Sequence, residues 1–411
     1  IPVVIKESRT DNSQTSFSII IDGGSSCQSE ETAGIDSLIF STLRLSVPET
    51  ASYKLFDECT ADYSLLNFSC GKKTFEASLS DFMSQFMSKS LSADFFASAA
   101  DDANSKVTDV HLIPEHFVQK IRSQIFSGMP YAVSPFPTEK SIQTITYADA
   151  DRRFAGMKDS SHIKIAAVGD FDEKSAARLI LNLEKSFGNL ERIPNTSFGK
   201  PAASEVKNRT EKETPLPAIK NGIQKISRDN FITDETVLDQ FEAKDLNRSL
   251  AVGCFLSPNY SDSDYAAFAL ATMVYDNLLR HELLGIHNMA FSAGCGILPG
   301  KIQLGLISIF ETDNTESAVQ EAKNATAVFP FPPDLDRVLS QYKRSYINQI
   351  VQPLHSSLSE MQMLVTSWIY FDDAESYTRR PALVNAVSAS EVCAAFEKYI
   401  KSAPVEWVII E

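Results

Sequence analysis

The residues best suited to hold a metal ion in this sequence are its six histidines, and two stretches combine histidine with glutamate. The first runs from His281 to Gly285 and begins like the H-E-x-x-H zinc motif, but Gly285 stands where the second imidazole belongs. His287 lies six residues after His281, and an α-helix that advances about 100° per residue turns it away from the same face. We therefore expect no zinc-binding histidine pair here.

The second stretch runs from His111 to His116 and reads H-L-I-P-E-H. It differs from the inverted motif H-x-x-E-H by one inserted residue. Pro114 would disrupt the helix on which the spacing of that motif depends. Both stretches are expected to hold ordinary surface or core histidines, and no metal or other cofactor is expected.

Other kinds of catalytic site also lack their usual signals. The chain has no G-x-S-x-G nucleophile elbow, and no motif ties a serine or cysteine to a histidine and a carboxylate. The glycine pair Gly294 and Gly296 is more typical of a turn than of a phosphate-binding loop. The six cysteines show no C-x-x-C spacing and are expected to be isolated thiols.

Charge and composition limit the partners and the compartment. Fifty-three acidic and thirty-eight basic residues give a formal net charge of −15, which disfavours nucleic acid as a partner. Hydrophobic residues make up 43% and charged residues 22%, as in folded globular proteins. No apolar run approaches the roughly 20 residues of a membrane-spanning helix. We expect a soluble protein, either cytoplasmic or, if a signal peptide was removed before Ile1, periplasmic or secreted.

An internal repeat organises the elements of the chain. Residues 145–154 and 387–396 share one pattern: an apolar residue, a hydroxyl N-cap, an acidic residue three positions later and a helix. Without a gap, residues 162–168 then match 404–410, and both stretches are typical of strands. A further pair of strands, 17–21 and 250–255, opens the two halves.

The repeat predicts an α+β protein made of two homologous α/β-sandwich domains that arose by internal duplication. Each domain is expected to have a mainly antiparallel sheet with helices packed on one face. The polar, proline-containing stretch between the halves cannot bury a core and is predicted to be a linker. The expected organisation is an N-terminal domain of residues 1–192, a linker of residues 193–221 and a C-terminal domain of residues 222–411.

Particular residues within this frame resemble a known family. The small-residue turn of residues 22–26 and the acidic stretch from Glu30 to Gly34 are similar to the opening of the insulinase/pitrilysin-like zinc metallopeptidases, whose members include mitochondrial-processing-peptidase-like two-domain units. The same resemblance extends over residues 162–190 and 387–411. It spans nearly the whole chain and implies the duplicated fold.

The resemblance also implies where the metal site would lie. Members of the family carry H-x-x-E-H on the helix after that glycine, with two imidazoles as zinc ligands and the glutamate as general base. Here Ser37 and Ser41 stand at the histidine positions and Phe40 at the position of the base. A serine hydroxyl is a poor zinc ligand, and phenylalanine cannot accept a proton. The resemblance therefore implies a degenerate site with no catalytic residue and no metal.

The family's third ligand is a glutamate on a later helix. Asp101, Asp102 and Asp109 are the nearby acidic residues in this chain, and none of them is matched to the ligand residue by residue. A solvated acidic helix face is the expected role of these aspartates.

Candidate substrate-binding residues come from both halves. Active relatives use an arginine and a tyrosine of the second half; here Leu284 and Phe291 stand at those positions, and Arg280 lies one turn earlier. In the first half, the stretch from Phe56 to Tyr63 is expected to be an exposed strand beside a groove. The predicted substrate-binding residues are thus Phe56, Tyr63, Arg280 and Phe291.

The function implied by the resemblance is that of a non-catalytic homologue. It would bind extended peptides by adding a strand to a sheet edge, or join a catalytically intact family member in a heterodimer, or form a homodimer. Two alternatives stay open: an active metallopeptidase with a non-standard site, and a purely structural interaction module without a groove.

Overall fold

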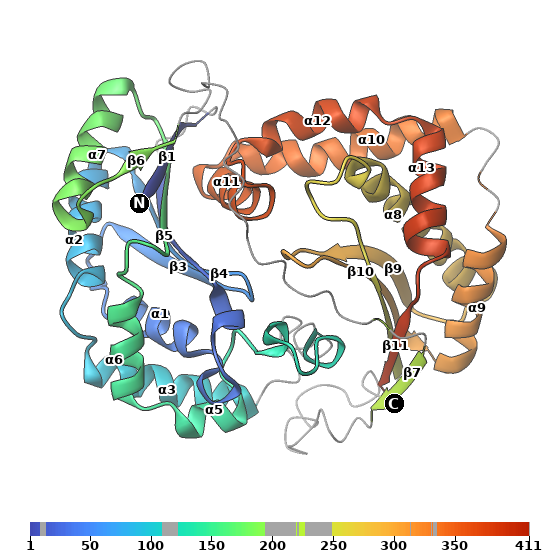
Figure 1. The fold of residues 1–411 in the computed structure, drawn as a ribbon, viewed down its shortest axis with the longest axis horizontal. Coiled ribbons are helices and arrows are strands. Elements are labelled where there is room, and N and C mark those ends of the chain that lie inside the picture. The colour runs from blue at the N-terminus through green and yellow to red at the C-terminus, as the bar shows by residue number, and fades with distance from the viewer. Residues whose placement is uncertain are drawn as a thin grey trace. The chain divides into compact units, whose positions relative to one another are not determined.

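The computed structural model describes residues 1–8, 14–108, 122–193, 219, 222–226, 249–312, 314–329, 331 and 335–410. The chain divides into two compact units, each built around one sheet (Figure 1). The first unit comprises Ile1–Thr108, Gly128–Glu213 and Ile350–Tyr377, and the second comprises Asp109–Ser127, Thr214–Gln349 and Thr378–Glu411. Most of the predicted linker 193–221 lies outside the described residues. Residues 350–377, which the sequence assigns to the second domain, cluster with the first unit.

The first unit contains a six-stranded sheet in the order β3-β4-β2-β5-β1-β6. Its strands are β1 (Pro2–Glu7), β2 (Gln14–Asp22), β3 (Tyr53–Cys59), β4 (Tyr63–Gly71), β5 (Ile163–Gly169) and β6 (Glu191–Arg192). The pairs β3/β4, β4/β2 and β2/β5 are antiparallel, whereas β5/β1 and β1/β6 are parallel. The central strand β2 is buried along nearly its whole length, because both of its faces are covered.

The second unit repeats this topology. Its five-stranded sheet has the order β7-β11-β8-β10-β9, with strands β7 (Gly222–Ile226), β8 (Ser249–Leu256), β9 (Ser292–Leu298), β10 (Leu304–Thr312) and β11 (Glu406–Ile410). Read from β9, this order matches β3-β4-β2-β5-β1 strand for strand, with the same single parallel pair at the same place. The predicted duplication and α+β class are confirmed.

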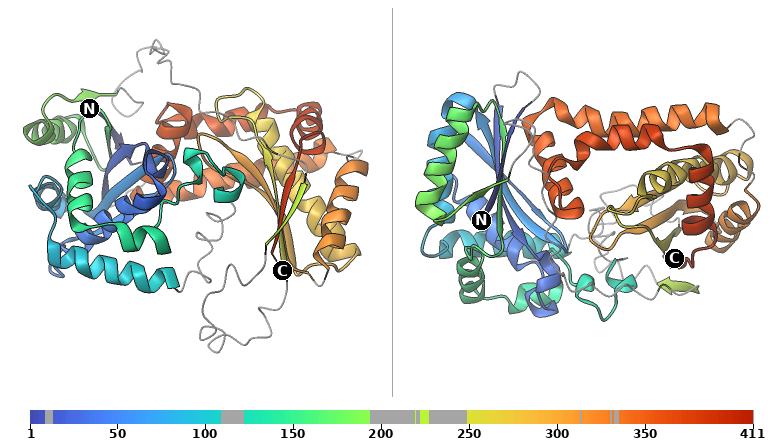
Figure 2. Two further views of the ribbon diagram at one scale, coloured as in Figure 1. Left: turned by 60° about the horizontal axis from the view of Figure 1, so that its bottom comes forward. Right: turned by 45° about the horizontal axis from the view of Figure 1, so that its top comes forward.

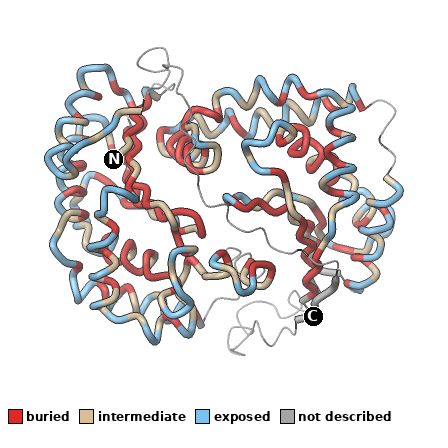
Figure 3. The backbone as a smooth tube through the Cα atoms, viewed as in Figure 1, coloured by how far each residue is buried: buried red, intermediate tan, exposed pale blue. Residues whose placement is uncertain are grey.

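The helices of the first unit are α1 (Ile35–Leu45), α2 (Phe75–Phe86), α3 (Ala93–Thr108), α5 (Glu139–Thr144), α6 (Tyr147–Gly156), α7 (Glu173–Phe187) and α11 (Ser357–Phe371). Side chains of α1, α2, α6 and α7 form one core with alternate residues of the sheet. Phe17, Phe68 and Phe82 meet in this core, with ring centroids 5.2–5.8 Å apart. The tube view shows most of the central strands as buried (Figure 3).

Helix α11 covers the opposite face of the same sheet, contacting β2 and β5. That face is polar: Lys6 is 1% exposed and forms an ion pair with Glu375, and Ser16 Oγ lies 3.2 Å from Ser357 Oγ. Buried polar side chains require partners, and residues 350–377 supply them. The first sheet is therefore covered on both faces, where the sequence predicts helices on one.

The second unit packs α8 (Tyr265–Arg280), α9 (Thr315–Val328), α10 (Leu335–Val351), α12 (Ser376–Ala386) and α13 (Ala389–Phe396) with its sheet, as two further views show (Figure 2). The predicted N-caps are present in both units. Thr146 caps α6 in a capping box with Asp149, and Ser388 caps α13 in the same way with Glu391. Within the described part of the chain, no helix has the length and apolar character needed to cross a bilayer.

Candidate functional site

The turn before α1 depends on two glycines. Gly24 has φ +44°, and a Cβ there would lie 2.3 Å from the Thr60 carbonyl oxygen. Gly34, at the N-cap of α1, has φ +77°, and a Cβ there would lie 2.0 Å from the Pro137 nitrogen. Both positions combine a left-handed backbone with close approach of another segment, which only glycine tolerates. The spacing on which the family resemblance rests thus has a direct structural cause.

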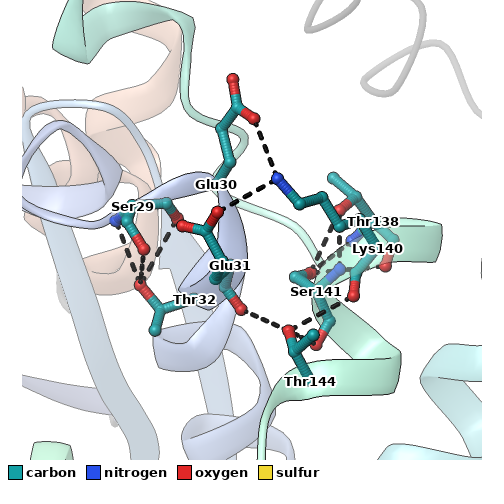
Figure 4. Close-up of polar contacts among 8 residues, drawn as sticks. All are labelled: Ser29, Glu30, Glu31, Thr32, Thr138, Lys140, Ser141 and Thr144. Atoms are coloured by element: carbon teal, nitrogen blue, oxygen red, sulfur yellow. Dashed lines mark hydrogen bonds and ion pairs between the residues drawn. The ribbon is translucent and has the colours of Figure 1, made fainter.

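The acidic stretch between these glycines is held by α5 (Figure 4). Lys140 Nζ lies 3.1 Å from Glu31 Oε1 and 3.3 Å from Glu30 Oε2, and Thr144 Oγ1 donates to the Glu31 carbonyl at 2.8 Å. A backbone hydrogen bond and the bond from Lys140 lower the pKa of Glu31. These contacts keep both carboxylates outside α1 and engaged with a lysine.

The three positions that the family resemblance assigns to the metal site lie on α1, where their surroundings do not suit zinc. Phe40 is fully buried in the first unit's core, and Ser37 and Ser41 are half-buried. Ser41 Oγ accepts a hydrogen bond from Arg44 Nη2 at 3.2 Å, and Arg44 Nη1 lies 2.6 Å from Asp57 Oδ1 on β3. In the described part of the first unit, no three histidine, cysteine or acidic side chains converge closely enough to hold an ion. These residues do not fit the family's zinc.

The acidic side chain nearest to Ser37 in sequence is Asp36, and it is already engaged. Asp36 is 1% exposed; its Oδ1 accepts from Arg153 Nε at 2.8 Å and its Oδ2 accepts from Arg153 Nη2 at 2.9 Å. Ser64 Oγ donates to the same carboxylate at 2.7 Å. The hydrogen bonds that Arg153 donates to Asp36 raise the pKa of Arg153. This two-point pair joins α1 to α6 and leaves Asp36 no role as base or ligand.

Two of the acidic residues considered as third ligand lie on α3. Asp101 and Asp102 are exposed on α3, and Asp102 Oδ2 lies 2.7 Å from Lys106 Nζ. Asp109 falls outside the described residues. The two described aspartates belong to a solvated helix face, one turn of which forms an i,i+4 ion pair.

The predicted peptide-binding strand is the edge strand β3. Phe56, on this strand, is 41% exposed, and the side chains of β3 alternate between buried and exposed. Tyr63, at the start of β4, is only 2% exposed, and its hydroxyl donates to Glu58 Oε1 at 2.9 Å. Burial raises the pKa of both Tyr63 and Glu58. Phe56 is thus available at the sheet edge, whereas Tyr63 is a packed side chain beneath it.

The second unit has a cavity of about 820 Å³ bordered by α8, β9 and α10. Arg280 lines it and donates through Nε to Asp276 Oδ2 at 2.9 Å, while Asp276 Oδ1 accepts from the Cys295 amide at 2.9 Å. Asn277 Nδ2 donates to the Tyr342 hydroxyl at 2.8 Å. Phe291 is 70% exposed and is not part of the lining. The structure does not bring Arg280 and Phe291 into one pocket.

The duplication relates this cavity to the α1 position. Helix α8 follows β8 as α1 follows β2, and β9 occupies the edge position that β3 occupies in the first sheet. The cavity in the second unit therefore lies beside the counterpart of α1. The sequence carries no signal for it, because its lining comes from residues far apart in the chain.

Comparison with known proteins identifies the fold. No protein-family model and no curated protein sequence matches the chain. Among solved structures, it resembles a peptidase M16 inactive domain from Pseudomonas fluorescens, with a TM-score of 0.75 and 16% identity over 99% of this chain and 94% of that one. A protease from Helicobacter pylori matches with a TM-score of 0.72 and 12% identity over 99% and 96% of the two chains.

A chain of Complex III2 from Candida albicans matches as well, with a TM-score of 0.71 and 11% identity over 99% of this chain and 93% of that one. These likenesses cover both units and nearly all of each matched chain. At identities of this size they establish architecture rather than activity. The chain has the duplicated fold of M16 peptidases, which is the fold that its resemblance to insulinase/pitrilysin-like zinc peptidases predicts.

Proposed function

We propose that this protein is a non-catalytic homologue of insulinase/pitrilysin-type peptidases. One observation carries the proposal: on α1, Ser37 and Ser41 stand where the zinc-binding histidines would be, and Phe40 stands buried where the base would be. The neighbouring Asp36 is bound to Arg153 and cannot substitute. No zinc is expected at this position. The matched structure described as an inactive M16 domain supports the idea that the fold persists without catalysis.

We propose that the retained activity is binding of extended peptide along β3. This strand ends the order of the first sheet, so no described strand pairs with its outer side. Its seven residues offer a row of backbone groups long enough for a short peptide to add as a further strand. Phe56 projects at the edge and would contact a side chain of that peptide.

A partner subunit is the second occupant that the proposal allows. The likeness to a chain of a multi-subunit complex shows that this fold also occurs inside assemblies. The partner would be a catalytically intact family member in a heterodimer or a second copy in a homodimer. In either case, an extended segment of the partner would pair with β3.

The test is equilibrium binding of fluorescent unstructured peptides, read by anisotropy. The wild-type chain is expected to bind saturably, and Phe56→Asp is expected to weaken binding at least about tenfold, because a charge replaces an apolar contact at the edge. Leu181→Asp is the matched control, since Leu181 is an exposed apolar residue of α7 that lies away from β3.

Two outcomes would overturn the peptide proposal. One is no saturable binding by a chain that is folded by circular dichroism, which would favour the structural module. The other is equal loss of binding in Phe56→Asp and Leu181→Asp, which would place the binding elsewhere. Chelator-sensitive cleavage of the peptides would instead favour an active metallopeptidase with a non-standard site.

A further inference from the structure

The second unit brings one imidazole and two carboxylates together just after the end of α8. Glu282 lies in the π-helical turn that follows α8 (His281–Ile286), His287 comes directly after that turn, and Glu321 comes from α9. The donor atoms of these three side chains all lie within 4.8 Å of one another. In the described part of the chain, this is the group of histidine, cysteine and acidic residues that meets the spacing of a metal site.

The distances suit a small divalent cation. His287 Nε2 lies 3.4 Å from Glu321 Oε1 and 3.8 Å from Glu282 Oε2. Zinc–ligand bonds of about 2.0–2.2 Å at tetrahedral angles separate neighbouring donors by about 3.3–3.6 Å. Nitrogen from imidazole and oxygen from carboxylate are both ordinary zinc ligands. We infer that Glu282, His287 and Glu321 form a zinc site with three protein ligands.

The charge of the three side chains also favours a bound cation. Neither Glu282 nor Glu321 forms an ion pair with a lysine or arginine among the described residues; both carboxylates lie next to His287. Their side chains are 22% and 25% exposed, so they are partly withdrawn from water. Two carboxylates around one imidazole leave a net negative charge that a divalent cation would offset.

The backbone explains why these residues meet. The His287 amide donates to the Glu282 carbonyl at 3.0 Å, which is the i to i+5 bond of a π-turn. In an α-helix, residues five apart would point about 140° from each other. The wider turn brings His287 over Glu282, and Asn288, with φ +48°, then turns the chain towards β9.

A bound metal ion would stabilise the packing of two elements of the second unit. It would join the end of the long α8 segment to α9, two elements that the sequence separates by a hairpin, and it would leave one coordination position for water. The existence of the site does not depend on the proposed function, because the zinc position of the family lies on α1 in the other unit.

The experiment is titration of the untagged full chain, first stripped of metal, with Zn²⁺ followed by calorimetry. One equivalent is expected to bind with high affinity and to raise the thermal midpoint. His287→Ala and Glu321→Gln are each expected to weaken binding by more than the about 10–100-fold that loss of an outer-shell partner costs. His281→Ala is the matched control, because His281 is exposed in the same turn and is not one of the three ligands.

Substitution with Co²⁺ supplies a second measurement. A visible absorption spectrum typical of four- or five-coordinate Co²⁺ is expected for wild type and His281→Ala, and its loss is expected in His287→Ala. The inference is overturned if no stoichiometric metal binds to the folded chain. It is equally overturned if His281→Ala loses as much affinity as His287→Ala, since the metal would then sit on scattered surface histidines.

Discussion

The α1 position of the first unit and its counterpart beside α8 in the second unit share one topology but differ in what fills them. Beside α1, the core residue Phe40 and the ion pair of Asp36 with Arg153 surround the positions that the family resemblance assigns to the metal site. Beside α8, a cavity of about 820 Å³ remains. The duplicated scaffold therefore tolerates a packed site in one unit and an open site in the other.

The largest effect is expected at the glycine that begins α1. Gly34→Ala would place a Cβ on the backbone of residues 136–137 at a positive φ, and we expect it to destabilise the protein by at least about 3 kcal/mol, from backbone strain and overpacking together. Gly296→Ala on β9 is the contrasting change, since a Cβ there meets no atom within 4 Å. Urea unfolding measures both; a similar cost for the two would contradict the contrast between packed and open sites.

The second-largest loss of stability is expected from breaking the ion pair of Asp36 with Arg153 in the first unit. Asp36→Ala leaves Arg153 and Ser64 without their acceptor, and a loss of about 3 kcal/mol is expected, as for other buried pairs deprived of one partner. Asp276→Ala removes a carboxylate of α8 that is 29% exposed beside a 54% exposed Arg280, and should cost about 1 kcal/mol. Equal losses of unfolding free energy for Asp36→Ala and Asp276→Ala, measured in urea, would mean that the two sites are packed alike.

The smallest stability effect should be the same in both units. Thr146→Ala and Ser388→Ala each remove the hydroxyl that caps the equivalent helices α6 and α13, and each is expected to cost about 1 kcal/mol. Thr146→Ser and Ser388→Thr serve as controls, because each keeps a hydroxyl at the cap. If the two substitutions lower the free energy of unfolding by very different amounts, the two caps are not structurally equivalent.

The same caps predict a dependence on pH. Hydrogen bonds from Thr146 lower the pKa of Asp149, and hydrogen bonds from Ser388 lower the pKa of Glu391. A lowered pKa in the folded state contributes stability above the unfolded pKa and loses it as pH falls through the folded value. The cost of Thr146→Ala or Ser388→Ala should therefore shrink between pH 7 and pH 3. Unfolding at the two pH values measures it; an increase at low pH would contradict the capping geometry.

The sequence predicts the elements that depend on local pattern. The repeated hydroxyl and acidic spacing locates α6 and α13, and the glycine at position 34 locates the start of α1. Contacts between residues far apart in the chain produce no local sequence pattern that would predict them. Asp36 and Arg153 are 117 residues apart, and nothing in either segment indicates the other.

Local geometry also limited what could be predicted. The helical spacing assumed for His281 and His287 is that of an α-helix, whereas the chain forms a π-turn there and pairs His287 with Glu282. The stretch 350–377 looks like part of the second half, but its buried polar residues meet Lys6 and Ser16 of the first sheet. Such contacts between polar side chains of a helix segment and of a sheet do not recur at a regular spacing, so the sequence does not reveal them.

Peptide cleavage in the presence of Zn²⁺ tests most directly the proposal that this protein is a non-catalytic homologue of the family. Unstructured peptides would be incubated with wild type and with His287→Ala, and the products identified by mass spectrometry with and without chelator. The account predicts intact peptides in every case, even where wild type holds zinc in its second unit. Chelator-sensitive cleavage by the wild-type chain would contradict it.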